Sequence, residues 1–466
     1  MKTTSMVLIA LALSSQAFAE DLLIKVAQPV STKHAAIYFN SHGLKSEAVT
    51  DQWIRVQGNV TAADMHSFLE SSSVVKVQKN YKIKILKNPS LQQALQTYLA
   101  AHPEQANAPF AASAAKDNPP IPDVPTQSTG VDPLLAKQWG MNEIGVQNAW
   151  KLNPGSNNII VAIIDTGVDY THEDLLPNMW RNTKEIPNNN IDDDNNGYVD
   201  DIVGWDFLDN DNKPYDLAAT SLQDILNGGN PGHGTHCAGN VAARGQNGIG
   251  TSGVAPNAQI MALRFIGEQG TTDAAIKSIH YAVDNGAKVL SNSWGSEGED
   301  SADADENQAL RDAIKYAQDH DVLFIAAAGN STINNDTSDK RGYPASYDYD
   351  NIISVAAIDS ANKLGSFSNY GAKTVDIAAP GVKIFSTTVG GNYSDSVIPL
   401  LGANWDGTSM ACPHVAGAAA LYWSAHPEKT SAEVKAAILN SAKPVASAQG
   451  KVLTNGKLSV ENLMNQ

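Results

Sequence analysis

The sequence has few cysteines and few basic residues for its length. It contains 2 Cys among 466 residues, which excludes a disulfide-stapled scaffold and a cysteine-rich zinc module. Its 32 Lys and Arg residues stand against 49 Asp and Glu residues, giving a formal net charge of -17. So acidic a chain does not offer the basic surface that nucleic-acid binding requires, and we expect no nucleic-acid partner.

Long apolar runs are also missing after residue 20. No later stretch reaches the roughly 18 apolar residues needed to span a bilayer, so we expect no membrane span. Hydrophobic residues nonetheless make up 42% of the chain, which is ordinary for a globular protein and too much for a disordered one. The length favours two or three domains.

The first 19 residues have the pattern of a secretion signal. Lys2 precedes a short apolar run at 6–13, and Ala17-Phe18-Ala19 matches the small-x-small rule for cleavage. The alternative is a buried first helix, which the shortness of the run disfavours. We therefore predict that residues 1–19 are removed on export, to the extracellular space or the periplasm.

Residues 20–101 alternate between two kinds of hydrophobic pattern. Strand-like and helical stretches follow one another at 21–26, 32–41, 51–58, 61–71 and 74–86. This β-α-β-α-β order predicts a small α+β domain of ferredoxin-like type, with both helices on one face of its sheet.

A segment rich in Ala, Pro, Ser and Asn follows at 102–133. It shows no amphipathic period and contains Pro119, Pro120, Pro122 and Pro125, which is typical of an extended linker. All of the acidic excess lies in residues 116–466. We therefore predict a domain boundary here.

The remaining residues, 134–466, alternate buried strands with helices. Five near-continuous apolar runs are typical of strands covered on both faces, at 159–164, 259–266, 288–294, 322–328 and 352–358. Ile276, Ile279 and Val283 give a helical stripe between them. The pattern predicts an α/β domain with a parallel sheet, whose ligands usually lie beyond the carboxyl ends of the strands.

Three motifs near those strand ends carry reactive side chains. Asp165 closes the run IVAIID, His233 lies in GHGTHCAG, and Ser409 lies in GTSMACPHVAG, where a loop enters an Ala-rich helix. Taken singly, Asp165 could be a strand-end cap and His233 a structural residue. Together they supply the nucleophile, the base and the carboxylate orienting the base that acyl transfer needs.

In chain order and in the surrounding motifs, these three segments resemble the subtilisin-like serine proteases. The resemblance extends from about Trp139 to the C-terminus. It implies a subtilisin-like catalytic domain in which Asp165, His233 and Ser409 form a catalytic triad. A fourth motif, VLFIAAAGN, ends at Asn330, and by the same resemblance this side-chain amide stabilises the oxyanion.

The resemblance also implies where a peptide substrate binds. Family members hold the peptide in extended form, by strand addition, beside the segment that is Ser-Trp-Gly here. Gly342 would leave the floor of the acyl-side pocket open to bulky apolar side chains, while Trp294 could equally be a core residue. The implied substrate-binding residues are Ser293, Trp294, Gly295, Ala328, Gly329 and Gly342.

An acidic loop, NNNIDDDNNGYVDD, spans 188–201. Its Asp and Asn residues have the 1-3-5 spacing of a Ca²⁺ loop, with Gly at position 6 for the sharp bend. Val203 stands where an EF-hand has Glu, so the loop is not an EF-hand. The alternative is a solvated Asn/Asp loop. The candidate Ca²⁺ ligands are Asp192, Asp194, Asn196, Asp200 and Asp201.

The family resemblance implies a second Ca²⁺ site, at Asp174 paired with Asn247.

Two cysteines also lie close to the predicted triad, since Cys237 follows His233 by four residues and Cys412 follows Ser409 by three. Their apolar surroundings favour two small buried core residues over a reactive thiol or a disulfide.

These patterns together predict an exported, self-processing serine endopeptidase that acts on polypeptides. Residues 20–101 would be its inhibitory propeptide, and 102–133 would contain the maturation cut. We expect broad specificity, structural Ca²⁺, no organic cofactor and a monomer. The alternatives are a processing protease of narrow specificity and an inactive Ca²⁺-dependent binding protein on the same fold.

Overall fold

The structure is a computed structural model that describes residues 18–27, 39, 43–60, 74–107, 119–125, 129–217, 219, 221–296 and 307–466. The chain divides into two compact units, Met1–Asn80 and Tyr81–Gln466. Most of the predicted signal, the predicted helix at 61–71 and all of that at 32–41 except Phe39 lie outside the described residues.

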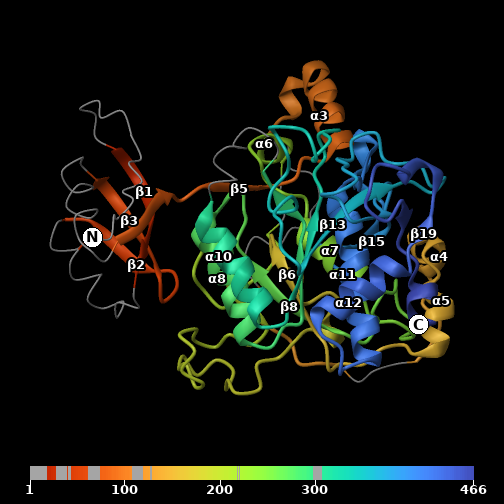
Figure 1. Ribbon diagram of the computed structural model, residues 1–466, viewed down its shortest axis with the longest axis horizontal. Coiled ribbons are helices and arrows are strands. Elements are labelled where there is room, and N and C mark those ends of the chain that lie inside the picture. The colour runs from red at the N-terminus through yellow and green to blue at the C-terminus, as the bar shows by residue number, and fades with distance from the viewer. Residues whose placement is uncertain are drawn as a thin grey trace, which may run out of the picture. The chain divides into compact units, whose positions relative to one another are not determined.

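The first unit contains a four-stranded antiparallel sheet with strand order β2-β3-β1-β4 (Figure 1). Its strands are β1 Phe18–Val26, β2 Lys45–Ala48, β3 Trp53–Val60 and β4 Val74–Lys79. Leu22, Ile24 and Val56 belong to its apolar core, because alternate side chains of a strand share one face. This sheet agrees with the predicted small pro-domain.

The predicted strand at 74–86 is divided in the structure. β4 ends at Lys79, and a separate strand, β5 Lys82–Ile85, belongs to the second unit. β5 pairs antiparallel with β9 Gly270–Thr271 and with β11 Trp294–Gly295. The alternating Lys and Ile residues of β5 continue the pattern of β4, so the sequence does not mark the change of partner.

A nine-stranded sheet forms the centre of the second unit, with strand order β19-β20-β14-β13-β12-β10-β6-β8-β7. All neighbours pair in parallel except β19 and β20. The strands are β6 Ile160–Asp165, β7 Gly204–Asp206, β8 Gln259–Arg264, β10 Val289–Asn292, β12 Leu323–Ala327, β13 Ile352–Ile358, β14 Ile377–Pro380, β19 Lys443–Pro444 and β20 Gly456–Lys457. All five predicted apolar runs contribute strands to this sheet, which confirms the α/β prediction.

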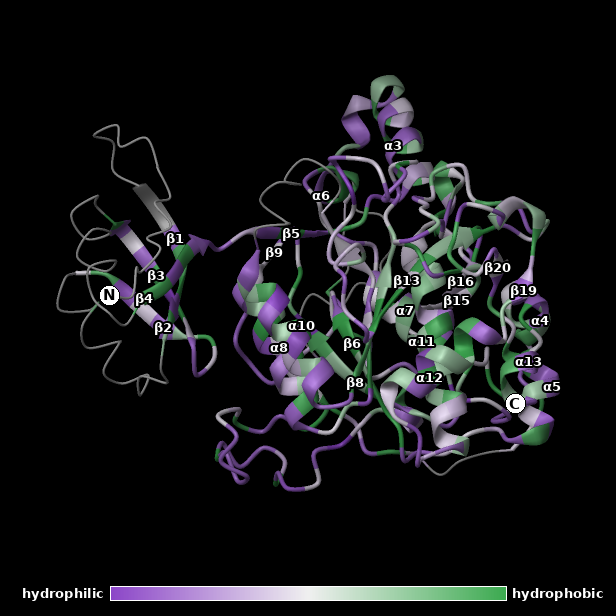
Figure 2. Cartoon of the chain, viewed as in Figure 1, coloured by the Kyte–Doolittle hydropathy of each residue, from purple (hydrophilic) through white to green (hydrophobic). Residues whose placement is uncertain are grey.

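Helices cover both faces of this sheet (Figure 1). α7 His233–Ala242 and α11 Thr408–Ala425 pack together against one face, and α8 Thr272–Asp284 and α10 Gln308–Asp319 pack together against the other. α11 is hydrophobic over most of its length (Figure 2) and is almost entirely buried, since its small Ala and Gly residues allow close packing.

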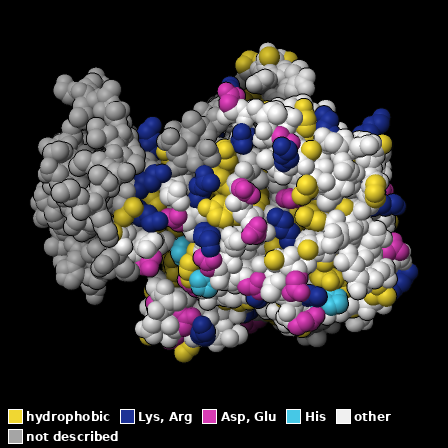
Figure 3. Space-filling view, in the orientation of Figure 1, with side chains coloured by type: hydrophobic (Ala, Val, Ile, Leu, Met, Phe, Trp, Pro, Cys, Tyr) yellow, Lys and Arg dark blue, Asp and Glu magenta, His cyan; other side chains and the backbone are white. Residues whose placement is uncertain are grey.

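Smaller elements surround this core. In the described ranges, the remaining α-helices are α3 Pro89–Ala101, α4 Trp139–Glu143, α5 Val146–Leu152, α6 Leu222–Leu226, α12 Ser431–Asn440 and α13 Val460–Met464. Two hairpins consist of β15 Ser386–Thr388 with β16 Asn392–Ser394, and β17 Ser396–Ile398 with β18 Ala403–Asn404. On the face shown in Figure 3, acidic and basic side chains of this unit are interspersed.

No helix in the described part of the chain combines the length and the apolar character needed to cross a membrane.

The strand order brings three reactive or polar segments to one edge. β12, β10 and β6 are neighbours in the sheet and end at Ala327, Asn292 and Asp165. Because carboxyl ends of parallel strands meet at one edge, the segments that follow these residues lie close together. α7 and α11 begin at this same edge, as the contacts of His233 and Ser409 described next require.

Candidate active site

Asp165 and His233 form a buried hydrogen-bonded pair. Asp165 is the last residue of β6, and His233 is the first residue of α7. Asp165 Oδ1 lies 2.8 Å from His233 Nδ1, and Thr166 N–H donates to the same oxygen at 2.8 Å. The carboxylate therefore fixes the orientation of the imidazole and leaves Nε2 on the opposite side of the ring.

A close approach of two backbone segments positions this pair. A Cβ on Gly234 would lie 2.1 Å from Gly167 O, so glycine is required where α7 begins against the turn after β6. Asn230 Oδ1 accepts hydrogen bonds from the backbone N–H groups of Gly232 and His233. These bonds satisfy donors at the start of α7, which no preceding turn can partner.

Asp216 lies behind the pair and links its two segments. Asp216 Oδ1 accepts a hydrogen bond from Thr166 Oγ1 at 2.9 Å, and Oδ2 accepts from Thr235 N–H and Oγ1 at 2.9 and 2.7 Å. Burial raises the pKa of Asp216 to about 7. Sequence analysis missed this residue because it lies in a long loop without a motif.

Ser409 is the second residue of α11 and is buried. Its Oγ donates to Ser293 O at 3.2 Å, and Ser293 Oγ donates to Ser409 O at 2.8 Å. Cys237 Sγ lies 3.5 Å from Ser409 O and 3.9 Å from His233 Nδ1, so α7 and α11 bring all three motifs close together. Within the described residues, His233 Nε2 is buried without a hydrogen-bond partner.

Asn330, which follows β12, is held by the residue before Ser409. Asn330 Oδ1 accepts hydrogen bonds from Thr408 N–H and Oγ1, at 2.9 and 2.8 Å. The amide oxygen is thus occupied, and Nδ2 donates on its other side to Lys87 O at 2.9 Å. A rigidly held N–H donor of this kind can stabilise a developing oxyanion. Thr408 had no sequence signal for this supporting role.

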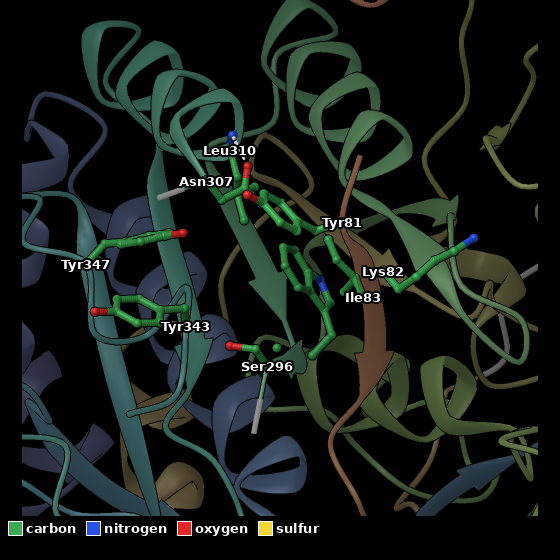
Figure 4. Close-up of a pocket in the computed structure, with 10 residues that line it drawn as sticks. Tyr81, Lys82, Ile83, Ser296, Asn307, Leu310, Tyr343 and Tyr347 are labelled. Carbon is green, nitrogen blue, oxygen red and sulfur yellow. Dashed lines mark hydrogen bonds between the residues drawn. The ribbon is translucent and has the colours of Figure 1, made fainter. Parts of the chain in front are cut away.

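The Ser-Trp-Gly segment follows β10, and Trp294 and Gly295 form β11. Trp294 is 1% exposed and packs edge-on against Phe265, with ring centroids 5.1 Å apart. It also lines a pocket with Leu310, Tyr343 and Tyr347 (Figure 4). Trp294 is therefore a core residue that also reaches the cleft, whereas the sequence offered the two as alternatives.

Two asparagines fix the wall formed by Ala328 and Gly329. The Nδ2 groups of Asn335 and Asn369 donate to Ala328 O at 3.0 and 3.1 Å. A Cβ on Gly342 would lie 2.9 Å from the same oxygen, so Gly342 packs directly against this wall. The three predicted pocket residues are thus neighbours in the structure.

Both cysteines are free and buried. Burial raises the pKa of the Cys237 thiol and raises that of Cys412 to about 12. Cys412 Sγ donates to Ile325 O at 3.5 Å, inside the core. A thiol with a raised pKa forms little thiolate, so the favoured interpretation as inert core residues agrees with this geometry.

In the acidic loop, two of the predicted ligands cluster with one carboxylate that was not predicted. Oxygens of Glu185, Asp192 and Asp194 all lie within 4.8 Å of one another. Three hard oxygen donors at this spacing fit a Ca²⁺ ion. Sequence analysis missed Glu185 because it precedes the loop and lies outside the 1-3-5 spacing.

The other predicted ligands of this loop accept hydrogen bonds from within the protein, as Glu185, Asp192 and Asp194 also do. Asp200 accepts hydrogen bonds from two backbone N–H groups, and Asp201 accepts them from Asn182, Asn196 and Tyr281. Burial raises the pKa of Asp201 to about 6. Asn196 Oδ1 accepts from a backbone N–H, so this side chain and the two carboxylates brace the loop.

The second predicted Ca²⁺ site contains two buried carboxylates. Asn247 Nδ2 donates to Asp174 Oδ1 at 2.9 Å, and Thr251 donates to Oδ2 through N–H and Oγ1. Backbone N–H groups of Gln246 and Asn247 donate to Asp132. Burial raises the pKa of Asp174 to about 7, and the charge of Asp132 adds to this shift. Sequence analysis placed Asp132 in the linker and missed it.

A parallel α/β sheet with these reactive side chains at its carboxyl edge defines the class of subtilisin-like serine endopeptidases. Comparison with known proteins agrees, because residues 156–460 match the Peptidase S8 model that describes the subtilase family. The chain therefore belongs to the subtilase family.

Two curated proteins are similar to this chain over 70% of its length. Thermophilic serine proteinase of Bacillus sp. (strain AK1) is 36% identical over 327 residues, which cover 70% of this chain and 66% of that protein. Thermitase of Thermoactinomyces vulgaris is 36% identical over 331 residues, which cover 70% of this chain and 96% of thermitase.

Among solved structures, fervidolysin from Fervidobacterium pennivorans, a keratinolytic enzyme related to subtilisin, has a similar fold. The TM-score is 0.62 at 24% sequence identity, and the match covers 97% of this chain and 62% of fervidolysin. This chain thus spans slightly less than two thirds of fervidolysin.

Proposed function

We propose that this chain is an endopeptidase that hydrolyses polypeptides through an acyl-enzyme on Ser409. The observation that carries the proposal is the buried Asp165–His233 hydrogen bond beside Ser409 and the fixed amide of Asn330. Membership of the subtilase family supports the same assignment. An inactive binding protein would not need the orientation of these four side chains.

In the proposed reaction, substrate binding turns Ser409 Oγ from Ser293 O toward His233 Nε2. The imidazole takes the hydroxyl proton as Oγ attacks the peptide carbonyl, and later gives that proton to the leaving amine. Asn330 Nδ2 donates to the oxyanion of the tetrahedral intermediate. Water, deprotonated by the same imidazole, then hydrolyses the ester and frees Ser409.

The pKa of His233 supports its proposed role as the base. Burial lowers the pKa of His233, but the charge of Asp165 and its hydrogen bond outweigh that effect and raise the pKa above its usual 6.5. A raised pKa makes His233 a stronger base, at the cost of protonation in acid. Activity is therefore proposed to rise with pH as His233 loses its proton.

Several further assignments belong to this proposal. The apolar acyl-side pocket of Gly295, Ala328, Gly329 and Gly342 would accept bulky apolar side chains, with broad specificity beyond it. An inhibitory propeptide would lie within residues 20–101, and the chain would be exported behind its predicted signal and act as a monomer.

An active-site-directed serine reagent tests the proposed function. A fluorophosphonate is expected to label the processed protein at Ser409, located by peptide mapping, and to stop hydrolysis of casein in proportion to labelling. Heat-unfolded protein is the control and should not react. A folded protein that neither reacts nor hydrolyses casein would contradict the proposal.

We also propose that Ca²⁺ stabilises the folded chain. Glu185, Asp192 and Asp194 would hold one ion, whose charge would offset the repulsion between their carboxylates. Buried Asp132 and Asp174 would benefit in the same way at the second site, where burial now raises both pKa values.

Removal of Ca²⁺ is expected to lower the melting temperature by roughly 5–10 °C, since a ligand bound only to the folded state stabilises it by mass action. The measurement compares calcium-loaded and chelator-treated protein by calorimetry, with Ser409 substituted by Ala to prevent autolysis. Asp192→Asn should shrink the difference, whereas Asp193→Asn in the same loop should not. An unchanged melting temperature after chelation would refute this part.

A further inference from the structure

A strand of this chain itself occupies a substrate-like position. β5 is the central strand of a three-stranded antiparallel sheet with order β11-β5-β9. Ile85 pairs with Trp294 and Lys84 with Gly295 on one side, and Ile83 pairs with Gly270 on the other. An extended segment held by backbone bonds on both edges is how an added peptide strand binds.

The register of this sheet identifies the residue beside the nucleophile. Continuing the pairing of β5 with β11 by one residue places Leu86 opposite Ser293. Ser293 exchanges two hydrogen bonds with Ser409, at 2.8 and 3.2 Å. The backbone of Leu86 is therefore brought next to Ser409.

Side-chain burial agrees with this register. Leu86 is 4% exposed, and its Cδ2 lies 3.6 Å from the point that a Cβ on Gly295 would occupy. Ile83 is 7% exposed and points into the pocket of Trp294, Tyr343 and Tyr347, while Lys82 points away (Figure 4). Leu86 and Ile83 are thus the two side chains of this segment that lie in apolar pockets of the cleft.

Lys87 has the opposite character. Its side chain is exposed, whereas its carbonyl oxygen accepts the hydrogen bond from Asn330 Nδ2 at 2.9 Å. The peptide bond between Leu86 and Lys87 therefore follows Leu86, which lies opposite Ser293, and precedes the Lys87 carbonyl, which accepts from Asn330 Nδ2. The oxyanion of this cleavage would be Leu86 O, so the chain has to shift until Asn330 Nδ2 donates to Leu86 O in place of Lys87 O. The register of β5 and the burial of Leu86, and not this hydrogen bond, select the bond after Leu86 over the next one.

We propose that the first self-cleavage of this chain hydrolyses the Leu86–Lys87 bond, and that the segment starting at Lys87 stays on the catalytic domain as an amino-terminal arm. The inference rests on the proposed function. It places the cut before the 102–133 segment to which the sequence pattern assigned it.

The chemistry is one round of the proposed reaction, carried out within the chain. Ser409 Oγ forms an ester with the Leu86 carbonyl carbon as the bond to the Lys87 nitrogen breaks. His233 transfers the hydroxyl proton to that nitrogen, which leaves as the new amino terminus. One water then hydrolyses the ester, so a single water is consumed and a Leu86 carboxylate is formed.

The arm keeps its contacts after such a cut. Asn88 caps α3 through a hydrogen bond from Leu91 N–H at 3.0 Å, and Asn88 Nδ2 and Ser90 Oγ donate to Asn404 O at 2.9 and 3.2 Å. These bonds start immediately after the proposed cut. They place the beginning of α3 beside the segment that leads into Ser409.

Apolar packing holds the rest of the arm. Leu91 and Leu95 of α3 are 4% and 0% exposed and share an apolar cluster with Leu222, Ile225 and Ile398. Further along, Gln223 N–H donates to the main-chain oxygen of residue 106, and Tyr170 and Arg181 donate to those of residues 119 and 122. The described parts of 88–125 are thus bound to the domain rather than extended as a linker.

The decisive experiment follows self-cleavage of purified full-length precursor over time. Amino-terminal sequencing and intact mass are expected to show one new amino terminus at Lys87, a first fragment ending at Leu86, and a large fragment that retains α3. A first new terminus at Asn88 or within 102–133 would overturn the proposal. If the protein reacts with the fluorophosphonate but cuts elsewhere, this inference fails alone; if it neither reacts nor cuts, the proposed function fails.

Variants on the same strand separate specificity from folding. Leu86→Asp places a charge in an apolar pocket and is expected to slow self-cleavage about 100-fold or more. Lys84→Asp, on an exposed position of β5, should cleave at nearly the parental rate. The peptide YKIKILKNPS, residues 81–90, gives a readout independent of precursor folding, and processed enzyme should cut it between Leu and Lys. Cleavage at another bond would count against the proposal.

A separate experiment tests whether the packing of α3 holds the arm on the catalytic domain. Leu95→Asp should detach α3 and make the segment after Lys87 at least about 10-fold more sensitive to trypsin, whereas Gln96→Asp, exposed on the same helix, should not. Equal sensitivity of the parent and the Leu95 variant would show that the arm is not held by this packing.

Discussion

Ser409→Ala is expected to leave the chain as uncut precursor that hydrolyses no casein. Without the hydroxyl there is no acyl-enzyme, and loss of a triad nucleophile lowers kcat by about 10⁶-fold. Residual hydrolysis would come only from the remaining oxyanion donor and substrate binding. Precursor length by intact mass and casein hydrolysis at equal protein concentration provide the two measurements.

The same substitution should not unfold the chain. Ser409 Oγ donates one hydrogen bond, to Ser293 O, and Ala has a high helix propensity in the first turn of α11. The melting temperature should stay close to that of an inhibited parent. If the Ser409→Ala variant keeps its fold and loses activity, the loss comes from the missing nucleophile and not from unfolding.

Ser424→Ala is the matched control. Ser424 lies on the same helix, and its Oγ donates to Leu421 O at 2.7 Å, away from the cleft. This variant should process itself and hydrolyse casein like the parent. Self-cleavage of Ser409→Ala at the parental rate, in protein free of host proteases, would contradict the assignment of Ser409 as nucleophile.

Sequence alone was sufficient for the parts of this protein that local patterns encode. Continuous apolar runs predicted the central strands because strands buried on both faces tolerate few polar residues. The motifs around Asp165, His233 and Ser409 predicted residues that α7, α11 and β6 do bring together. Asn330 was predicted from the family resemblance of the motif that ends at this residue, directly after a buried strand.

Contacts between distant segments were beyond such patterns. Glu185 joins Asp192 and Asp194 because the chain folds back before the acidic loop, and nothing in the loop spacing encodes that return. Asp216 and Thr408 likewise act through hydrogen bonds to distant segments, and no periodicity in the sequence encodes these bonds. Sequence motifs predict the reactive residues, whereas the residues that position them are brought there by the tertiary structure.

β5 shows a third kind of limit. Its Lys-Ile alternation predicts a strand correctly, yet a period of two says nothing about which neighbour the strand pairs with. Sequence analysis therefore joined it to the first unit and placed the maturation cut in the Pro-rich segment beyond. The pairing of β5 with β9 and β11 leads to a different proposed cut.

Asp165→Asn is expected to lower the rate of self-cleavage by about 10⁴-fold with little change in fold. The Asn amide can donate to His233 Nδ1, which places the imidazole proton on Nε2. That nitrogen can then no longer accept the proton of Ser409. Because the precursor cleaves its own chain, the first-order rate of precursor loss measures this effect without prior maturation.

The pH dependence gives a second, independent signature of the same substitution. In the parent, burial lowers the pKa of His233, but the charge of Asp165 and the other contacts of the imidazole together raise this pKa by a larger amount. The net pKa therefore lies above 6.5. Self-cleavage should therefore fall as pH drops through that raised value. Without the carboxylate charge the pKa falls, and the acid limb of the variant should move to lower pH even though its plateau rate is far smaller.

Asp216→Asn is the control that separates direct from indirect action. It removes a buried charge near the pair, but Asp216 hydrogen-bonds to Thr166 and Thr235 rather than to the imidazole. Its rate loss should be much smaller, because the tautomer of His233 is unchanged. If Asp165→Asn instead kept the parental plateau rate, or if both substitutions lowered the rate equally, the hydrogen bond to Nδ1 would not be what orients the base.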